Sequence, residues 1–124
     1  GVSETRSLDE SIIGYSQGKT VAHTRQMGQL LKLLFPHCRS IISLGGSDIG
    51  YVAAGRCDAF LDNSSTPWDF AALDLMIQEA GGCSSDWKGG PWRSRSKNIL
   101  LSNPYLHGPL LEILGQIMDK STSS

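Results

Sequence analysis

The chain has 124 residues, which is enough for one domain with a hydrophobic core but not for two. Hydrophobic residues make up 40% and charged residues 19%, as in ordinary globular proteins, and a net charge of −1 argues against nucleic-acid binding. No apolar run has the length of a membrane span or the form of a signal peptide, so a cytoplasmic location is expected. The chain begins with Gly1 rather than Met, which suggests a cut fragment or a tag remnant.

The first half of the chain alternates between β-prone runs and helical patterns. Residues 11–16 form a short β-prone run, and residues 20–35 have apolar positions at helical spacing until Pro36 stops the helix. Residues 38–44 predict a second strand, rich in β-branched side chains. Two glycines then lead into a short helix at about residues 48–55.

The second half continues the alternation and adds two successive strands. Residues 57–62 predict the third strand, and residues 66–82 predict a mostly buried helix with Pro67 at its first position. The last two strands are expected at residues 83–86 and 98–102.

An amphipathic helix is expected to close the chain at about residues 104–119, with Asn103 as its N-cap. Residues 1–120 are therefore expected to form one domain, and residues 121–124 a disordered tail. The order of elements predicts an α/β fold in which a mainly parallel sheet of about five strands is flanked by helices. In such sheets ligands bind beyond the carboxyl ends of the strands.

Two strand-to-helix junctions meet that rule. The first, residues 43–48, is rich in glycine and could present backbone N–H groups to an anion, although a tight turn explains it equally well. The second, residues 62–69, contains Asp62, Asp69 and several hydroxyl groups near one helix start. That chemistry suits a hard cation such as Mg²⁺, but two carboxylates alone do not make a strong site.

Asp69 has two interpretations that the local pattern leaves open. As the third residue of a helix capped by Thr66, it could complement the positive end of the helix dipole. Alternatively, because it lies on the apolar side of a buried helix, it could point into a cleft and bind a cation or a reacting group.

Two segments resemble the C-terminal half of the inositol monophosphatase family of Mg²⁺-dependent, lithium-sensitive phosphatases. They are Y-V-A-A-G-R-C-D-A-F at residues 51–60 and P-W-D-F-A-A-L-D-L-M-I-Q-E-A-G-G at residues 67–82. The similarity extends from about Val2 to the closing helix, so it covers nearly the whole chain but only about half of a family member. It implies that the chain is the C-terminal α/β layer of that fold.

The resemblance also assigns roles to residues. Asp69 is similar to the family's catalytic metal ligand, which binds Mg²⁺ at the cleft between the two halves. Asp62 is similar to the family residue that contacts a substrate hydroxyl. Ser43, Leu44 and Gly45 occupy a segment whose backbone lies near the substrate, but Ser43-Leu44 replaces the usual Gly-Ser or Gly-Thr. The remaining metal carboxylates of the family belong to its N-terminal half and have no counterpart in these residues.

These observations predict a phosphate monoesterase that acts on a phosphorylated small molecule and is inactive without its N-terminal half. An isolated half should expose apolar surface, so a homo-oligomer is expected. The alternative is a non-catalytic module that keeps the fold for binding or assembly. A nucleotide-binding α/β domain is a weaker third possibility, because no glycine fingerprint is present.

Overall fold

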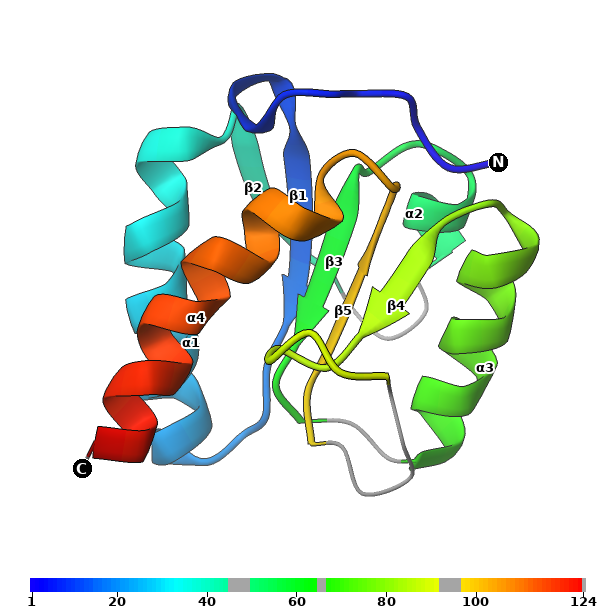
Figure 1. Ribbon diagram of the computed structural model, residues 1–124. Helices are drawn as coiled ribbons and strands as arrows, with labels where there is room; N and C mark the ends of the chain where they lie inside the picture. Colours follow the sequence, from blue (N-terminus) through cyan, green and yellow to red (C-terminus); the bar gives the residue numbers. More distant parts are fainter. Residues whose placement is uncertain (45–49, 65–66, 92–96, 124) are drawn as a thin grey trace.

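The computed structural model describes residues 1–44, 50–64, 67–91 and 97–123, with the side chains of residues 50, 67–70 and 119–123 left out (Figure 1). The elements follow the predicted order of strands and helices, with two 3₁₀ turns in addition. They are η1 (Leu8–Glu10), β1 (Ile12–Ser16), α1 (Val21–Leu34), η2 (Phe35–His37), β2 (Ser40–Ser43), α2 (Gly50–Ala53), β3 (Ala59–Asp62), α3 (Pro67–Glu79), β4 (Cys83–Ser85), β5 (Ile99–Ser102) and α4 (His107–Ser123). The predicted α/β fold is therefore confirmed.

The five strands form one sheet in the order β2-β1-β3-β5-β4. The pairs β1–β2 and β1–β3 are parallel, whereas β3–β5 and β4–β5 are antiparallel. Four strands thus run in one direction and β5 alone runs against them, so the sheet is mixed rather than strictly parallel.

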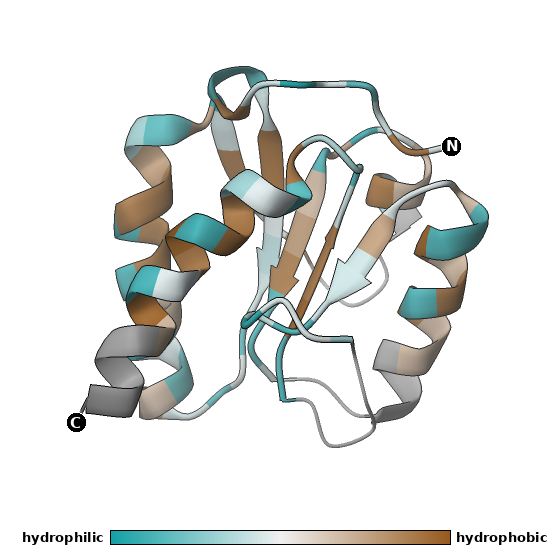
Figure 2. Ribbon diagram, viewed as in Figure 1, coloured by the Kyte–Doolittle hydropathy of each residue, from teal (hydrophilic) through white to brown (hydrophobic). Residues whose placement is uncertain are grey.

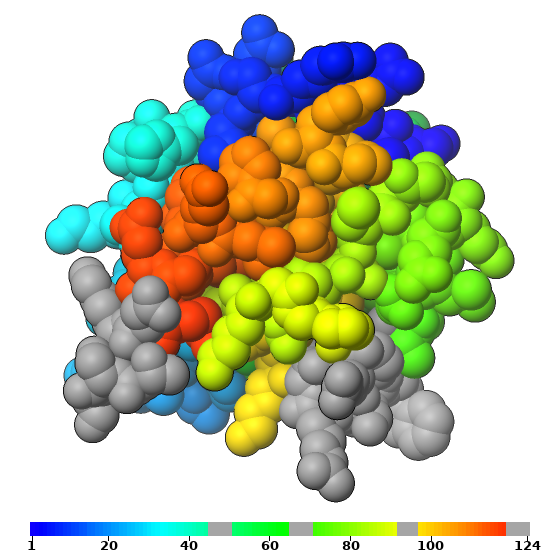
Figure 3. Space-filling view, in the orientation of Figure 1, coloured from blue at the N-terminus to red at the C-terminus, as the bar shows by residue number. Residues whose placement is uncertain are grey.

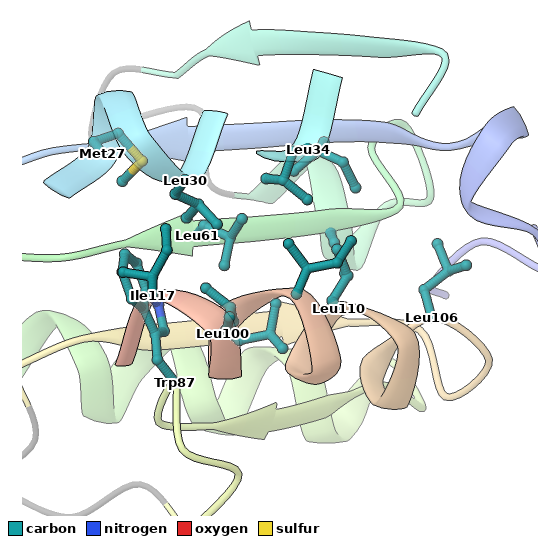
Figure 4. Packing of buried hydrophobic residues seen from close by; sticks show 13 residues of the cluster. Met27, Leu30, Leu34, Leu61, Trp87, Leu100, Leu106, Leu110 and Ile117 are labelled. Atoms are coloured by element: carbon teal, nitrogen blue, oxygen red, sulfur yellow. The ribbon is translucent and has the colours of Figure 1, made fainter. Parts of the chain in front are cut away.

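Helices cover both faces of the sheet, because the side chains of the central strands alternate between two apolar clusters. Ala59 and Leu61 of β3 pack with α1 and α4, and Phe60 between them packs with α2 and α3. Figure 2 shows the hydrophobic colouring of the central strands, and Figure 4 shows how α1 and α4 side chains meet Leu61 and Leu100. The result is a three-layer arrangement of helices, sheet and helices.

Trp87 closes the α4 side of the core. Its side chain is fully buried, and the indole Nε1–H donates to the Ile99 carbonyl at 3.0 Å. Trp87 is therefore part of the hydrophobic core.

The ends of the helices follow from local chemistry. Thr20 caps α1, since its hydroxyl accepts from the His23 amide at 3.1 Å. Pro67 is the first residue of α3, as predicted. Gly81, with φ of 86°, closes α3 in the left-handed conformation that favours glycine.

The closing helix differs from its prediction at both ends. Asn103 is a cap as expected, because its Oδ1 accepts from the Leu106 amide at 2.9 Å, but residues 104–106 form a turn and α4 starts at His107. At the other end α4 reaches Ser123 instead of stopping near residue 119. No Gly or Pro follows residue 109 to interrupt it except Gly115, which α4 accommodates.

The N-terminal segment is tied across the amino edge of the sheet by a buried carboxylate. Asp58 accepts from the Ile12 amide at 2.6 Å and from the Ser3 hydroxyl. Asn103 donates from Nδ2 to both Ser3 Oγ and the Thr5 carbonyl. In Figure 3 this segment (blue) lies along the start of α4 (orange), where the Arg6 guanidinium stacks 4.5 Å from the centre of the Tyr105 ring. Over the described residues, no helix is long and apolar enough to cross a membrane.

Candidate functional site

The carboxyl ends of β1, β2, β3 and β4 lie at one edge of the sheet, opposite the edge that Asp58 occupies. Helices α1 and α3 begin at that same edge (Figure 1). This geometry brings strand ends and helix N-termini together, which is the usual position of ligand sites in α/β folds. Ser43 and Asp62, the first residues of the two junctions that the sequence singled out, lie at this edge.

Asp62 is the last residue of β3 and is only 4% exposed. It is in register with Ser16 of β1, and its Oδ1 accepts from the Ser64 amide at 2.9 Å. That bond is an Asx turn, which fixes the carboxylate against the loop that leads to α3. A buried carboxylate held at a strand end is well placed to accept from a polar ligand.

Asn63 connects this loop to the neighbouring elements through hydrogen bonds of its side chain. The sequence analysis did not single out this residue. Its Oδ1 accepts from the Gly18 amide at 3.0 Å, and its Nδ2 donates to the His23 carbonyl at 2.9 Å and to Gln26 Oε1 at 3.1 Å. The side chain is 3% exposed. An Asn after a strand is common in turns, so nothing local distinguished it.

The first junction is described only in part. Ser43 ends β2 and is exposed, and Leu44 follows it with its amide donating to the Tyr15 carbonyl at 2.8 Å. The Leu44 side chain is buried in the cluster of α2 and α3, so only its backbone is available to a ligand. Gly45 lies outside the described residues. β1 separates Ser43 from Asp62, which places the two strand ends roughly 10 Å apart.

Asp69 lies in the first turn of α3, seven residues after Asp62, where the positive end of the helix dipole favours a carboxylate. Its side chain and the expected cap Thr66 are outside what the structure describes. Among described residues, no group of three or more His, Cys, Asp or Glu side chains could hold a metal ion. Carboxylate oxygens are donors of the kind that suits Mg²⁺, which takes one or two protein carboxylates.

A cavity of about 440 Å³ opens beside Asn63, between the first turns of α1 and the residues that lead into β5. It is lined by Ala22, His23, Arg25, Gln26, Gln29, Asn63, Lys97 and Asn98. Apart from Ala22 every one of these side chains is polar.

His107 is partly buried and is the first residue of α4. Its Nε2 lies 2.8 Å from Ser85 Oγ and its Nδ1 lies 2.7 Å from Ser102 Oγ, so the ring links β4 and β5 to the start of α4. Burial lowers the pKa of His107 below its usual value. Its partners are 22 and 5 residues away, and no spacing rule connects them.

The model of the inositol monophosphatase family matches residues 1–119. The chain belongs to the inositol monophosphatase family. This family member is 31% identical over 121 residues to the fructose-1,6-bisphosphatase/inositol-1-monophosphatase of Thermotoga maritima, covering 96% of the chain and 45% of that protein. It is 36% identical over 119 residues to an inositol-1-monophosphatase of Caulobacter vibrioides, covering 91% and 46%.

Other relatives of this inositol monophosphatase family member are named as Nus factors rather than as phosphatases. It is 36% identical over 105 residues to the Nus factor SuhB of Escherichia coli, covering 82% of the chain and 39% of that protein. Among solved structures, a Thermotoga maritima IMPase superposes with a TM-score of 0.83 at 30% identity, covering 96% of the chain and 46% of that structure. The chain thus spans less than half the length of these relatives.

Proposed function

We propose that this chain is the C-terminal half of a Mg²⁺-dependent phosphate monoesterase. The observation that carries the proposal is the edge at which β3 ends with the buried Asp62 and α3 begins five residues later. Family membership supports phosphate-ester hydrolysis as the type of reaction. The substrate would be a phosphorylated small molecule with free hydroxyl groups.

Each site residue has a separate role in this proposal. Asp69, in the first turn of α3, would be the metal ligand that this chain supplies, and Asp62 would accept a hydrogen bond from a substrate hydroxyl. The backbone of Ser43, Leu44 and Gly45 would border the substrate on the other side of β1. Mg²⁺, when bound, supplies charge stabilisation for phosphoryl transfer to water.

An Asp69→Asn variant tests the proposal in the protein that contains both halves. We expect phosphate release with Mg²⁺ to fall by about two or more orders of magnitude, because several kcal/mol of charge stabilisation depend on the ligand. The matched control is Asp74→Asn on the same helix, where Asp74 bonds to Gln78 and Ser84 away from the site. Wild-type turnover in the Asp69→Asn variant would show that the assignment is wrong.

The chain alone is proposed to be inactive, since the described residues provide no complete metal site. The 124-residue chain should therefore release no phosphate with Mg²⁺, even when it is folded by circular dichroism. Activity comparable to that of the two-half protein would refute this part of the proposal.

The outer face of α3 suggests where the other half packs. Leu75 is 61% exposed and Met76 is 40% exposed, and Ala71 and Ala72 on the same helix are also exposed. We expect the N-terminal half to cover this surface, and a second copy to cover it when the chain is alone. Sedimentation should show a concentration-dependent dimer that Leu75→Lys with Met76→Lys weakens, and a strictly monomeric wild type would contradict it.

A non-catalytic assembly module is the second candidate. It is favoured by the relatives named Nus factor SuhB and by the apolar face of α3. The two candidates separate in one assay, because an assembly module would release no phosphate from any ester even with both halves and Mg²⁺ present.

A further inference from the structure

Two cations from distant parts of the sequence converge on the cavity beside Asn63. Arg25 belongs to α1, and Lys97 lies just before β5. Neither forms an ion pair within the described part of the chain, and none of the described residues that line the cavity is acidic. In a chain whose net charge is −1, the described lining of this cavity therefore carries two positive side chains and no negative one.

The walls of the cavity are built from neutral hydrogen-bonding groups. Four residues with side-chain amides, Gln26, Gln29, Asn63 and Asn98, line the cavity together with the two cations. Asn63 is rigid because all its polar atoms are bonded, and Asn98 is held by the Trp87 amide, which donates to its Oδ1 at 2.8 Å. Amide and guanidinium N–H groups are suitable donors to an oxyanion.

The cavity adjoins the candidate site. Asn63 lines it and follows Asp62 directly, so the cavity lies next to the strand end that carries Asp62.

We propose that this cavity binds a second anionic group of the substrate, a phosphate or a carboxylate, and that Arg25 and Lys97 are its charged contacts. The identity of the ligand as a substrate rests on the proposed function, whereas the anion site itself does not. The planar guanidinium of Arg25 can give two parallel bonds to an oxyanion, and Lys97 contributes a point charge.

The anion site can be tested on the 124-residue chain with inorganic phosphate as the probe. At low ionic strength, where screening is weak, we expect saturable shifts of the side-chain ¹⁵N–¹H signals of Gln26, Gln29 and Asn98. Arg25→Gln and Lys97→Gln should each weaken binding about tenfold, since each removes a charge-assisted contact. The control Arg6→Gln, a cation on Tyr105 outside the cavity, should leave the affinity unchanged.

Two results of this titration would overturn the site. One is the absence of saturable shifts at these amides. The other is equal affinity in wild type and in the Arg25→Gln/Lys97→Gln double variant, which would mean an adventitious ion only.

The link to substrate is tested in the protein that contains both halves. With Mg²⁺, Arg25→Gln should raise KM about tenfold for a sugar bisphosphate and leave KM for the corresponding monophosphate unchanged. Equal changes for both substrates would overturn the link. If neither ester is hydrolysed, the proposed phosphatase function fails, while the phosphate titration still decides whether the cavity is an anion site.

Discussion

Replacing Asn63 with alanine should loosen the loop that carries Asp62. The side chain makes three hydrogen bonds in a position that is 3% exposed, and its removal leaves the buried Gly18 amide without a partner. An orphaned buried donor costs about 1–3 kcal/mol, and the lost amide bonds about 0.5–1.5 kcal/mol each. We therefore expect the free energy of unfolding to fall by about 2–6 kcal/mol, a large share of a typical 5–15 kcal/mol.

Urea denaturation of the wild-type and Asn63→Ala chains measures this loss as a lower midpoint at an unchanged m-value. Hydrogen exchange shows where the stability is lost. The Gly18 and Ser64 amides should exchange faster, whereas the exchange rates of β5 amides should rise only as far as the global free energy of unfolding falls. Asn63→Asp is the matched variant. Its carboxylate keeps an acceptor for the Gly18 amide but removes the N–H donor that bonds to the His23 carbonyl. A loss below about 1 kcal/mol with unchanged Gly18 exchange would refute the reasoning.

Three further predictions concern other parts of the fold. Burial lowers the pKa of His107, so the unfolded chain binds a proton at this residue at a higher pH than the folded chain does. The free energy of unfolding should therefore fall as the pH drops below about 6.5, and it should fall less steeply in His107→Gln. Urea midpoints at pH 7.5 and 5.5 measure the fall in each protein. Equal slopes in the two proteins would exclude His107 as the source. Asp58→Ala should lower the free energy of unfolding by about 2–4 kcal/mol, because the Ile12 amide and the Ser3 hydroxyl lose a charged acceptor, and should free residues 1–5 for faster proteolysis. Gly82→Ala should cost about 1–3 kcal/mol in the same denaturation assay, since the new Cβ would lie 2.8 Å from the Ser102 carbonyl oxygen; a neutral result would mean that the backbone shifts freely there.

Hydrophobic periodicity predicted the order of the elements and most of their bounds, because each pattern is local to its helix or strand. The direction of β5 depends on its pairing with β3, about 40 residues earlier. The described residues between β4 and β5 form no crossover helix, which is consistent with an antiparallel pair. The start of α4 was misplaced by a turn, since Asn103 caps residues 104–106 before the helix proper.

The candidate site was predictable to the extent that its residues lie at strand ends. Asp62 stands at the edge where a ligand is expected, and its predicted contact with a substrate hydroxyl stays a prediction. Asn63 and His107 could not be found from the sequence, because their partners are 37 to 45 residues away for Asn63 and belong to two strands for His107. Such bonds arise from tertiary packing and leave no periodic trace.

The reversed direction of β5 has a consequence for how this fold can diversify. Ser85 of β4 is paired with Leu100 of β5, so the connection between these strands leaves and re-enters the sheet at the edge that holds Asp62. The connection is held at its start by Trp87, whose indole N–H bonds to the Ile99 carbonyl, and at its end by the strand pairing of β5. Insertions or deletions between them would reshape the border of the site while every strand pairing stays in place, so new ligand preferences could evolve on an unchanged core.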